Sequence, residues 1–133
     1  TLDDLGLTVD DALAAAGYLL STDKDGRTVA ALKLYDAVEE VEPGNTAALS
    51  RQAILLAFTG DPELVERARD LVDRAIAADP MDPEALLSRA TVLFAVGDDD
   101  LACADLVVLA SRADVAIAIA DQAARLREAN CPG

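Results

Sequence analysis

The sequence has no histidine and no tryptophan, and its 133 residues include only two cysteines, two tyrosines and two phenylalanines. Without histidine, the commonest general base and metal ligand is missing, together with every catalytic triad that depends on it. Two cysteines are too few for a disulfide scaffold or for a structural zinc site of four ligands. The composition therefore predicts a protein that is not an enzyme, uses no cofactor and has no metal site.

Basic residues are also scarce, since 11 Lys and Arg face 25 Asp and Glu and the formal net charge is −14. Such a charge opposes binding to nucleic-acid phosphates and to anionic lipids, so we expect neither as a partner. Charged residues interrupt every apolar run before it reaches the roughly 20 residues of a membrane-spanning helix, so no direct membrane insertion is expected. The sequence predicts a soluble chain, either cytoplasmic or the soluble part of a membrane-anchored protein.

The residues that are abundant are small and aliphatic. Hydrophobic residues make up 53% of the chain and aromatic residues only 3%, so we expect a core of Ala, Leu, Val and Ile. The length predicts a single domain over residues 1–133. The chain begins at Thr1 without an initiator Met, which leaves open whether a longer protein precedes it.

The two cysteines allow two interpretations. Cys103 lies in a stretch rich in Ala and Leu, and Cys131 lies close to the C-terminus. We expect a buried thiol at Cys103 and an exposed, free thiol at Cys131. A Cys103–Cys131 bridge is the alternative.

An internal repeat organises the chain. The segment from Pro43 to Asp61 aligns without gaps on the segment from Pro80 to Asp98, 37 residues later. Each contains a large apolar residue, an Ala, a second large apolar residue and a Gly at spacings of 4, 3 and 4, which place the apolar residues on one helix face. An earlier, looser copy carries a similar pattern, with Gly17 in place of the Ala and a slightly longer turn before Gly26, and in every copy we expect the Gly to end the helix. The matching positions are Leu13, Gly17, Leu20 and Gly26; Leu49, Ala53, Leu56 and Gly60; and Leu86, Ala90, Leu93 and Gly97.

A second helix is expected in each unit, for example over 29–41 and 63–78. Asp61-Pro62-Glu63 and Asp82-Pro83-Glu84 are strong helix starts, and Thr8 and Asn45 are weaker caps. Residues 114–129 predict a seventh helix, which begins at Asp114 and covers the last exposed edge of the series of helix pairs. Its apolar side consists of Val115, Ile119 and Leu126, with Ile117 adjacent. The chain is therefore predicted to be all-α.

Such helix pairs resemble the tetratricopeptide repeat (TPR). The middle unit matches with Leu49, Ala53, Leu56, Gly60, Ala68, Val72, Ala75 and Pro80. The first matches with Leu13, Gly17, Leu20, Gly26, Ala31, Tyr35, Val38 and Pro43. The third matches with Leu86, Ala90, Leu93, Gly97, Ala102 and Leu106, but has Asp114 where the closing Pro would fall.

The resemblance implies a right-handed α-superhelix, an α-solenoid of three TPR-like helix pairs over about 9–43, 45–80 and 82–113, closed by the capping helix 114–129. The lengthened middle repeat is similar to that of small bacterial, often membrane-anchored members of the family. The resemblance also implies a concave groove that binds a peptide or helix of a partner protein, so the chain is expected to be a scaffold for protein–protein interaction.

The groove residues implied by the resemblance divide by role. Ile54, Leu87 and Phe94 are expected to make apolar contact, beside Ala57, and Tyr18, Ser50, Glu84 and Thr91 to set the orientation of the bound segment. The expected partner has an apolar and basic segment. The basic residues with which co-chaperone members hold a terminal carboxylate are absent, so chaperone-tail binding is not expected. The alternative is a structural or oligomerisation module of a longer chain, whose groove is covered by its own last helix or by a second copy.

Three other patterns have ordinary explanations. Residues 21–26 resemble the start of a calcium loop, but the position that needs a bidentate Glu is Leu32, so we expect an ordinary turn. The acids at 98–100 are expected to begin a helix rather than to bind a cation. Arg67, Arg69 and Arg74 are expected on a convex face, neutralised within their own helix by Glu63 and Asp70.

Overall fold

The computed structural model describes residues 1–20 and 25–132. Over these residues the chain forms eight helices and no strand, which confirms the all-α prediction. The helices are α1 (Leu2–Leu5), α2 (Val9–Leu20), α3 (Asp25–Val41), α4 (Thr46–Ala57), α5 (Pro62–Ala78), α6 (Pro83–Ala95), α7 (Asp99–Ala110) and α8 (Ile117–Asn130).

The expected helix starts are confirmed by hydrogen bonds. The Asp61 and Asp82 side chains accept from the backbone N–H groups of Glu63 and Glu84 at 2.9 and 3.1 Å, with Pro in the first turn of each helix. Asn45 caps α4 in the same way through Ala48 N–H at 3.0 Å. These side chains satisfy donors that have no partner within the first turn of a helix, which sets where α4, α5 and α6 begin.

The glycines after α4 and α6 end those helices as predicted. Gly60 and Gly97 have φ angles of 75° and 83°, in the left-handed region that a side chain disfavours. The prediction for Gly26 is wrong, because α3 begins at Asp25 and Gly26 lies in its first turn. A glycine is tolerated there because the first turn lacks most intrahelical hydrogen bonds.

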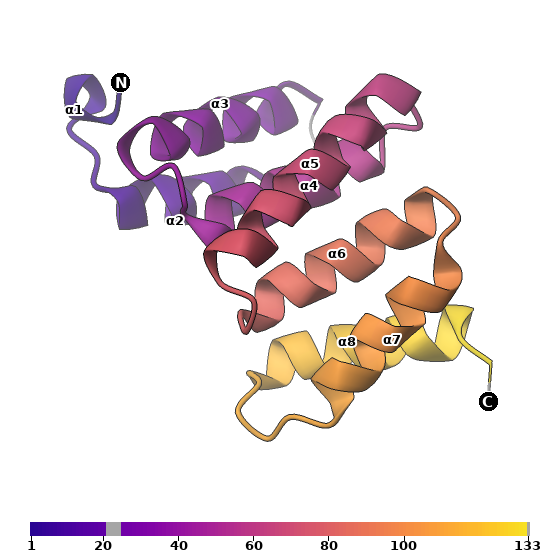
Figure 1. The fold of residues 1–133 in the computed structure, drawn as a ribbon. Helices are drawn as coiled ribbons and strands as arrows, with labels where there is room; N and C mark the ends of the chain where they lie inside the picture. The colour runs from indigo at the N-terminus through magenta and orange to yellow at the C-terminus, as the bar shows by residue number, and fades with distance from the viewer. Residues whose placement is uncertain (21–24, 133) are drawn as a thin grey trace.

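Sequential helices pack as pairs, α2 with α3, α4 with α5 and α6 with α7. The pairs follow one another along the molecule, from the indigo N-terminus to the yellow C-terminus (Figure 1). Helix α4 also contacts α6, and α8 contacts both α7 and α6. The buried aliphatic residues form three clusters along this series, and the repeat residues Leu49, Ala53 and Leu56 lie in the middle one.

The N-terminal segment differs from the expectation, because a short helix α1 precedes the first pair. Thr1 Oγ1 accepts from the Asp4 N–H at 3.3 Å, and Gly6 ends the helix with a φ of 69°. Leu2 is 2% exposed and packs into the first cluster. The sequence signal was a Thr three residues before an Asp, which is a helix-start pattern.

Helix α8 covers the last cluster as predicted, through Ile119 and Leu126, while Ile117 is 81% exposed. Val115 also packs against this cluster, but from the segment that precedes the helix. Its predicted start at Asp114 is wrong. The Asp114 carboxylate accepts from Arg112 Nε and Nη2 at 3.0 and 2.7 Å and does not cap the helix. The pKa of Asp114 is lowered by these bonds. The helix begins instead at Ile117.

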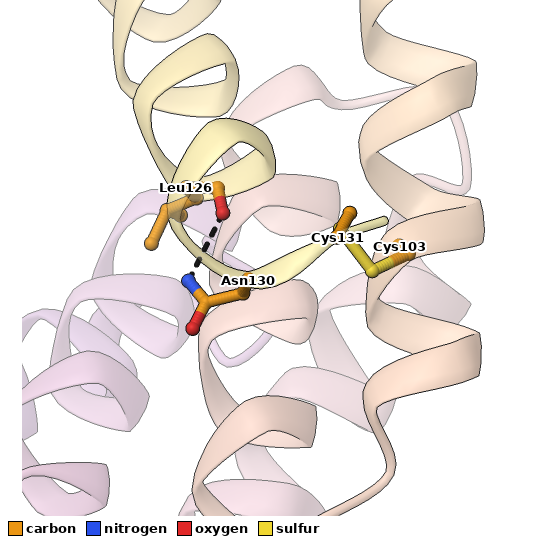
Figure 2. Close-up of a disulfide and its surroundings, with 4 residues drawn as sticks. All are labelled: Cys103, Leu126, Asn130 and Cys131. Atoms are coloured by element: carbon orange, nitrogen blue, oxygen red, sulfur yellow. Dashed lines mark hydrogen bonds between the residues drawn. A yellow bond between two sulfur atoms is a disulfide. The ribbon is translucent and has the colours of Figure 1, made fainter. Parts of the chain in front are cut away.

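The cysteines form a bridge, so the expectation of free thiols is wrong. Cys131 follows α8 in an extended conformation and lies beside Cys103 of α7, with the two Cα atoms 5.9 Å apart and the sulfurs bonded (Figure 2). Neither side chain is fully buried. The contact depends on the antiparallel course of α7 and α8, which joins residues 28 positions apart in the sequence.

The prediction that the arginines of α5 are neutralised within their own helix is wrong for Arg67 and Arg74. Arg74 Nη2 donates to Glu39 Oε1 of α3 at 2.7 Å, and Arg67 Nη2 lies 4.0 Å from Asp36 Oδ1 of α3. Both side chains reach across to the preceding helix pair, where carboxylates of α3 face them. These ion pairs therefore join α5 to α3 rather than stabilising α5 alone.

Candidate peptide-binding groove

Three hollows adjoin one another on the side of the molecule formed by α2, α4, α6 and α8. The central hollow, of about 340 Å³, is lined by Ile54, Phe58, Leu87, Thr91, Gln122, Arg125 and Leu126. The end hollow, of about 460 Å³, is lined by Ala57, Phe58, Gly60, Thr91, Phe94, Ala95, Leu126 and Asn130. The N-terminal hollow, of about 300 Å³, is lined by Gly17, Leu20, Tyr35, Arg51, Ile54 and Leu55.

Shared residues join the hollows into one groove. Ile54 lines both the N-terminal and the central hollow. Phe58, Thr91 and Leu126 line both the central and the end hollow. We call the three hollows together the groove. Its lining is mostly apolar, and it crosses successive helices rather than running along a single one, which is the form of surface that takes an extended or helical segment.

Most of the predicted groove residues lie in its walls. Ile54, Leu87 and Thr91 line the central hollow, and Ala57 and Phe94 line the end hollow. Leu87 and Ala57 are only 4% and 7% exposed, so both also belong to the core. The other three are half-buried and present part of their surface to the groove.

The predicted orienting residues are placed differently. Tyr18 lies on α2 at 69% exposure and lines none of the three hollows. Ser50 is fully buried, so its hydroxyl does not face the groove. Glu84 is engaged by Arg51, whose Nε donates to Glu84 Oε1 at 2.7 Å. Thr91 Oγ1 donates to the Leu87 carbonyl at 3.0 Å, so its oxygen lone pairs remain as one polar feature of the central hollow, beside Gln122 and Arg125.

Two contributions to the groove were missed from the sequence. Phe58 is 77% exposed and lies just after α4, where a large apolar side chain in a helix-ending segment was the available signal. Helix α8 supplies a wall through Gln122, Arg125, Leu126 and Asn130. The sequence leaves a groove covered by the last helix as the alternative, but it places Leu126 in the core and assigns none of these residues to the groove.

The polar end of the groove is Arg51, which lines the N-terminal hollow with Tyr35 and is paired with Glu84, a residue that lines none of the three hollows. The hydrogen bond to Glu84 raises the pKa of Arg51, so this guanidinium stays charged. Burial raises the pKa of Tyr35, so its phenol stays protonated. Arg51 joins α4 to α6 through Glu84, and the ion pair leaves little net charge at this end.

The other candidate sites have structural explanations or lie outside the described residues. Asp98 precedes α7, and Asp99 and Asp100 lie in its first turn, as predicted. Within residues 1–20 and 25–132, no group of three or more Cys, Asp or Glu side chains is arranged to hold a metal ion. Residues 21–24 of the calcium-loop pattern are not among those described, and Leu32 lies within α3.

Comparison with protein-family models gives no match, and neither the curated proteins nor the solved structures include one that matches the chain. In the part of the chain that is described, every helix is too short or too polar to cross a membrane. The function must therefore be argued from the groove itself.

Proposed function

We propose that the chain is a non-catalytic scaffold for protein–protein interaction, which binds an apolar peptide or helix of a partner protein in the groove. One observation carries the proposal: the central and end hollows share Phe58, an aromatic side chain that is 77% exposed. An exposed aromatic residue beside apolar hollows is typical of a binding surface, because its burial on association contributes both area and specificity.

We further infer that the three helix pairs follow the TPR pattern and form a right-handed superhelix with the groove on its concave side. The repeat residues at equivalent positions support this inference, since Leu49 and Leu86 are both core residues. Gly60 and Gly97 also end equivalent helices with similar backbone angles. A groove built on α4 and α6, the first helices of adjacent pairs, is what such a stack provides.

The occupant that we propose is a segment of a different protein. A second copy of this chain would carry the same net charge of −14, which opposes association. The same charge speeds encounter with a positively charged partner. Within the groove, the contacts are expected to be apolar, because Arg51 is already paired with Glu84.

The alternative is a structural or oligomerisation module of a longer chain. One observation favours it, because Leu126 and Arg125 of the chain's own last helix already line the central hollow. This helix covers one side of the groove and leaves about 340 Å³ of the central hollow open. Self-association in solution would favour the alternative, and a monomer that binds an apolar peptide would favour the scaffold.

The proposal is tested by truncating Phe58. Peptides are first selected from a random library on the immobilised wild-type chain, and the affinity of the tightest peptide is then measured by calorimetry. Phe58→Ala is expected to weaken this peptide by about tenfold or more, because truncating an aromatic anchor removes a large share of the binding energy. Leu87→Asp is unsuitable, since Leu87 is 4% exposed and a charge there would disrupt the core.

Met81→Ala is the matched control, because Met81 is also a large apolar residue in a turn and is 64% exposed, but lines none of the three hollows. It should leave the affinity unchanged. Equal affinities of the wild type and Phe58→Ala, with helicity retained in both, would contradict the proposed site. Light scattering over a concentration series tests the alternative, and a stable dimer that excludes the peptide would support it.

A further inference from the structure

The disulfide lies at the end of the helix that forms one wall of the groove. Leu126 of α8 lines both the central and the end hollow, and Asn130, one turn later, lines the end hollow. Asn130 Nδ2 donates to the Leu126 carbonyl at 3.0 Å and closes the last turn of the helix. Cys131 follows directly, and its bond to Cys103 ties this turn to α7 (Figure 2). The position of the groove wall is therefore coupled to a covalent bond.

Helix α8 has few other attachments. Of its 14 residues only Ala123 is buried, and its first turn has no side-chain cap. Among the described residues, no ion pair links α8 to another helix. The apolar contacts of Ile119 and Leu126 are those of partly buried side chains. A helix with so little buried surface frays readily unless it is held by other means.

The bond is open to reagents in solvent. Cys131 borders a hollow of about 420 Å³, with Ala124, Arg127, Glu128 and Pro132. This hollow is separate from the three that form the groove. A small dithiol can therefore reach the bond without entering the partner-binding surface, and access is one of the conditions for thiol–disulfide exchange.

We propose that the Cys103–Cys131 bond is a redox latch, which holds α8 in place as a wall of the groove when oxidised and releases it when reduced. The loosening of α8 follows from its own contacts. The effect on partner binding rests on the proposed function of the groove. Reduction is therefore expected to lower the affinity for a bound segment by removing the fixed position of Leu126.

We take a dithiol as the reductant. Its thiolate attacks one sulfur of the bond, so that a mixed disulfide forms and the other cysteine leaves as a thiolate, which takes up a proton. The second thiol of the reductant, as its thiolate, then displaces the first cysteine and closes an intramolecular disulfide. The protein gains two thiols and the dithiol is oxidised to its disulfide, so two electrons and two protons pass to the protein.

The latch is tested by hydrogen exchange of the full chain, followed by mass spectrometry. Three samples are compared: the oxidised wild type, the wild type reduced with dithiothreitol, and the Cys103→Ser/Cys131→Ser double variant. The measured quantity is the exchange rate of the α8 amides relative to that of the α4 amides, since this ratio removes any change shared by the whole molecule. Both ways of breaking the bond should raise the ratio by about tenfold or more.

A ratio that stays the same after the bond is broken would overturn the latch. Agreement between the reduced wild type and the double variant assigns the effect to the bond rather than to the serines. The library-selected peptide should also bind the reduced chain about tenfold more weakly. Unchanged peptide affinity with a loosened α8 would overturn the link to the groove, whereas failure of the groove itself would show in Phe58→Ala with the bond intact.

Discussion

Helices α4 and α8 border the same groove but are held in different ways. Helix α4 buries seven of its 12 residues, whereas α8 buries one of its 14. The Arg51–Glu84 ion pair joins α4 to α6, and the Cys103–Cys131 bond joins the end of α8 to α7. The side of the groove formed by α4 is thus fixed by the core, and the side formed by α8 depends on a covalent link near the C-terminus.

A short helical array can therefore have one rigid side and one adjustable side. A helix in the middle of a series packs on both neighbours, so burial alone fixes it. The last helix has a neighbour on one side only and buries fewer residues. Each remaining attachment therefore contributes a larger share of what holds this helix in place. Substitutions in the α4–α6 region should consequently change global stability, whereas changes at α8 should act mainly on local opening.

The largest effect is expected for Leu49→Ala. Leu49 is 1% exposed in the middle cluster, and its truncation leaves a cavity between α4 and α5. We expect a loss of about 3 kcal/mol in the free energy of unfolding. The half-buried Leu126 of α8 should cost about 1 kcal/mol when changed to Ala. Urea titration of both variants measures the contrast, and equal losses would contradict the comparison.

A smaller effect is expected for Asp105→Asn. Asp105 is 7% exposed and accepts two bonds from Arg89, from Nε at 2.8 Å and from Nη2 at 2.7 Å, joining α7 to α6. Loss of its charge should cost about 2 kcal/mol, because Arg89 keeps its charge without a full partner. Asp114→Asn is the matched control, since Asp114 also pairs with one arginine but is exposed. The free energy of unfolding should change little in this variant.

The smallest effect has the opposite sign. The Ser88 hydroxyl on α6 is fully buried and has no hydrogen-bond partner among the described residues. Ser88→Ala removes this cost and favours the helix, so stability should rise by about 1 kcal/mol. Ser50→Ala should behave alike, and it should leave peptide affinity unchanged, because the side chain is turned away from the groove. Thermal unfolding checks the rise in stability, and calorimetry checks the peptide affinity of Ser50→Ala. Destabilisation would contradict the first expectation, and a changed affinity would contradict the second.

Much of the helical framework could be predicted because the signals were local. Asp61 and Asp82 mark helix starts through bonds to residues two positions later, and Gly60 and Gly97 mark ends through their own backbone angles. Such contacts depend only on neighbouring residues. The start of α8 was misplaced because Asp114 bonds to Arg112, a competing local partner that the capping pattern does not reveal.

The groove could be predicted only in part, because its walls come from distant segments. Ile54 and Thr91 were found because the repeat places them on equivalent faces of α4 and α6. Ser50 was assigned to the groove, although one helix position decides between the groove and the core, and the sequence pattern does not resolve that choice. The α8 wall and the Cys103–Cys131 bond depend on how α7 and α8 return past each other, and no local pattern encodes that course.

The most direct test of the groove is a methyl NMR titration of the oxidised chain with the library-selected peptide. The methyl signals of Ile54 on α4, Leu87 on α6 and Leu126 on α8 should shift together, since all three line the central hollow. Val29 on α3 and Val107 on α7, which are 54% and 50% exposed and line none of the three hollows, should keep their positions. Shifts at Val29 or Val107 without shifts at Ile54 and Leu126 would contradict binding of the peptide in the groove.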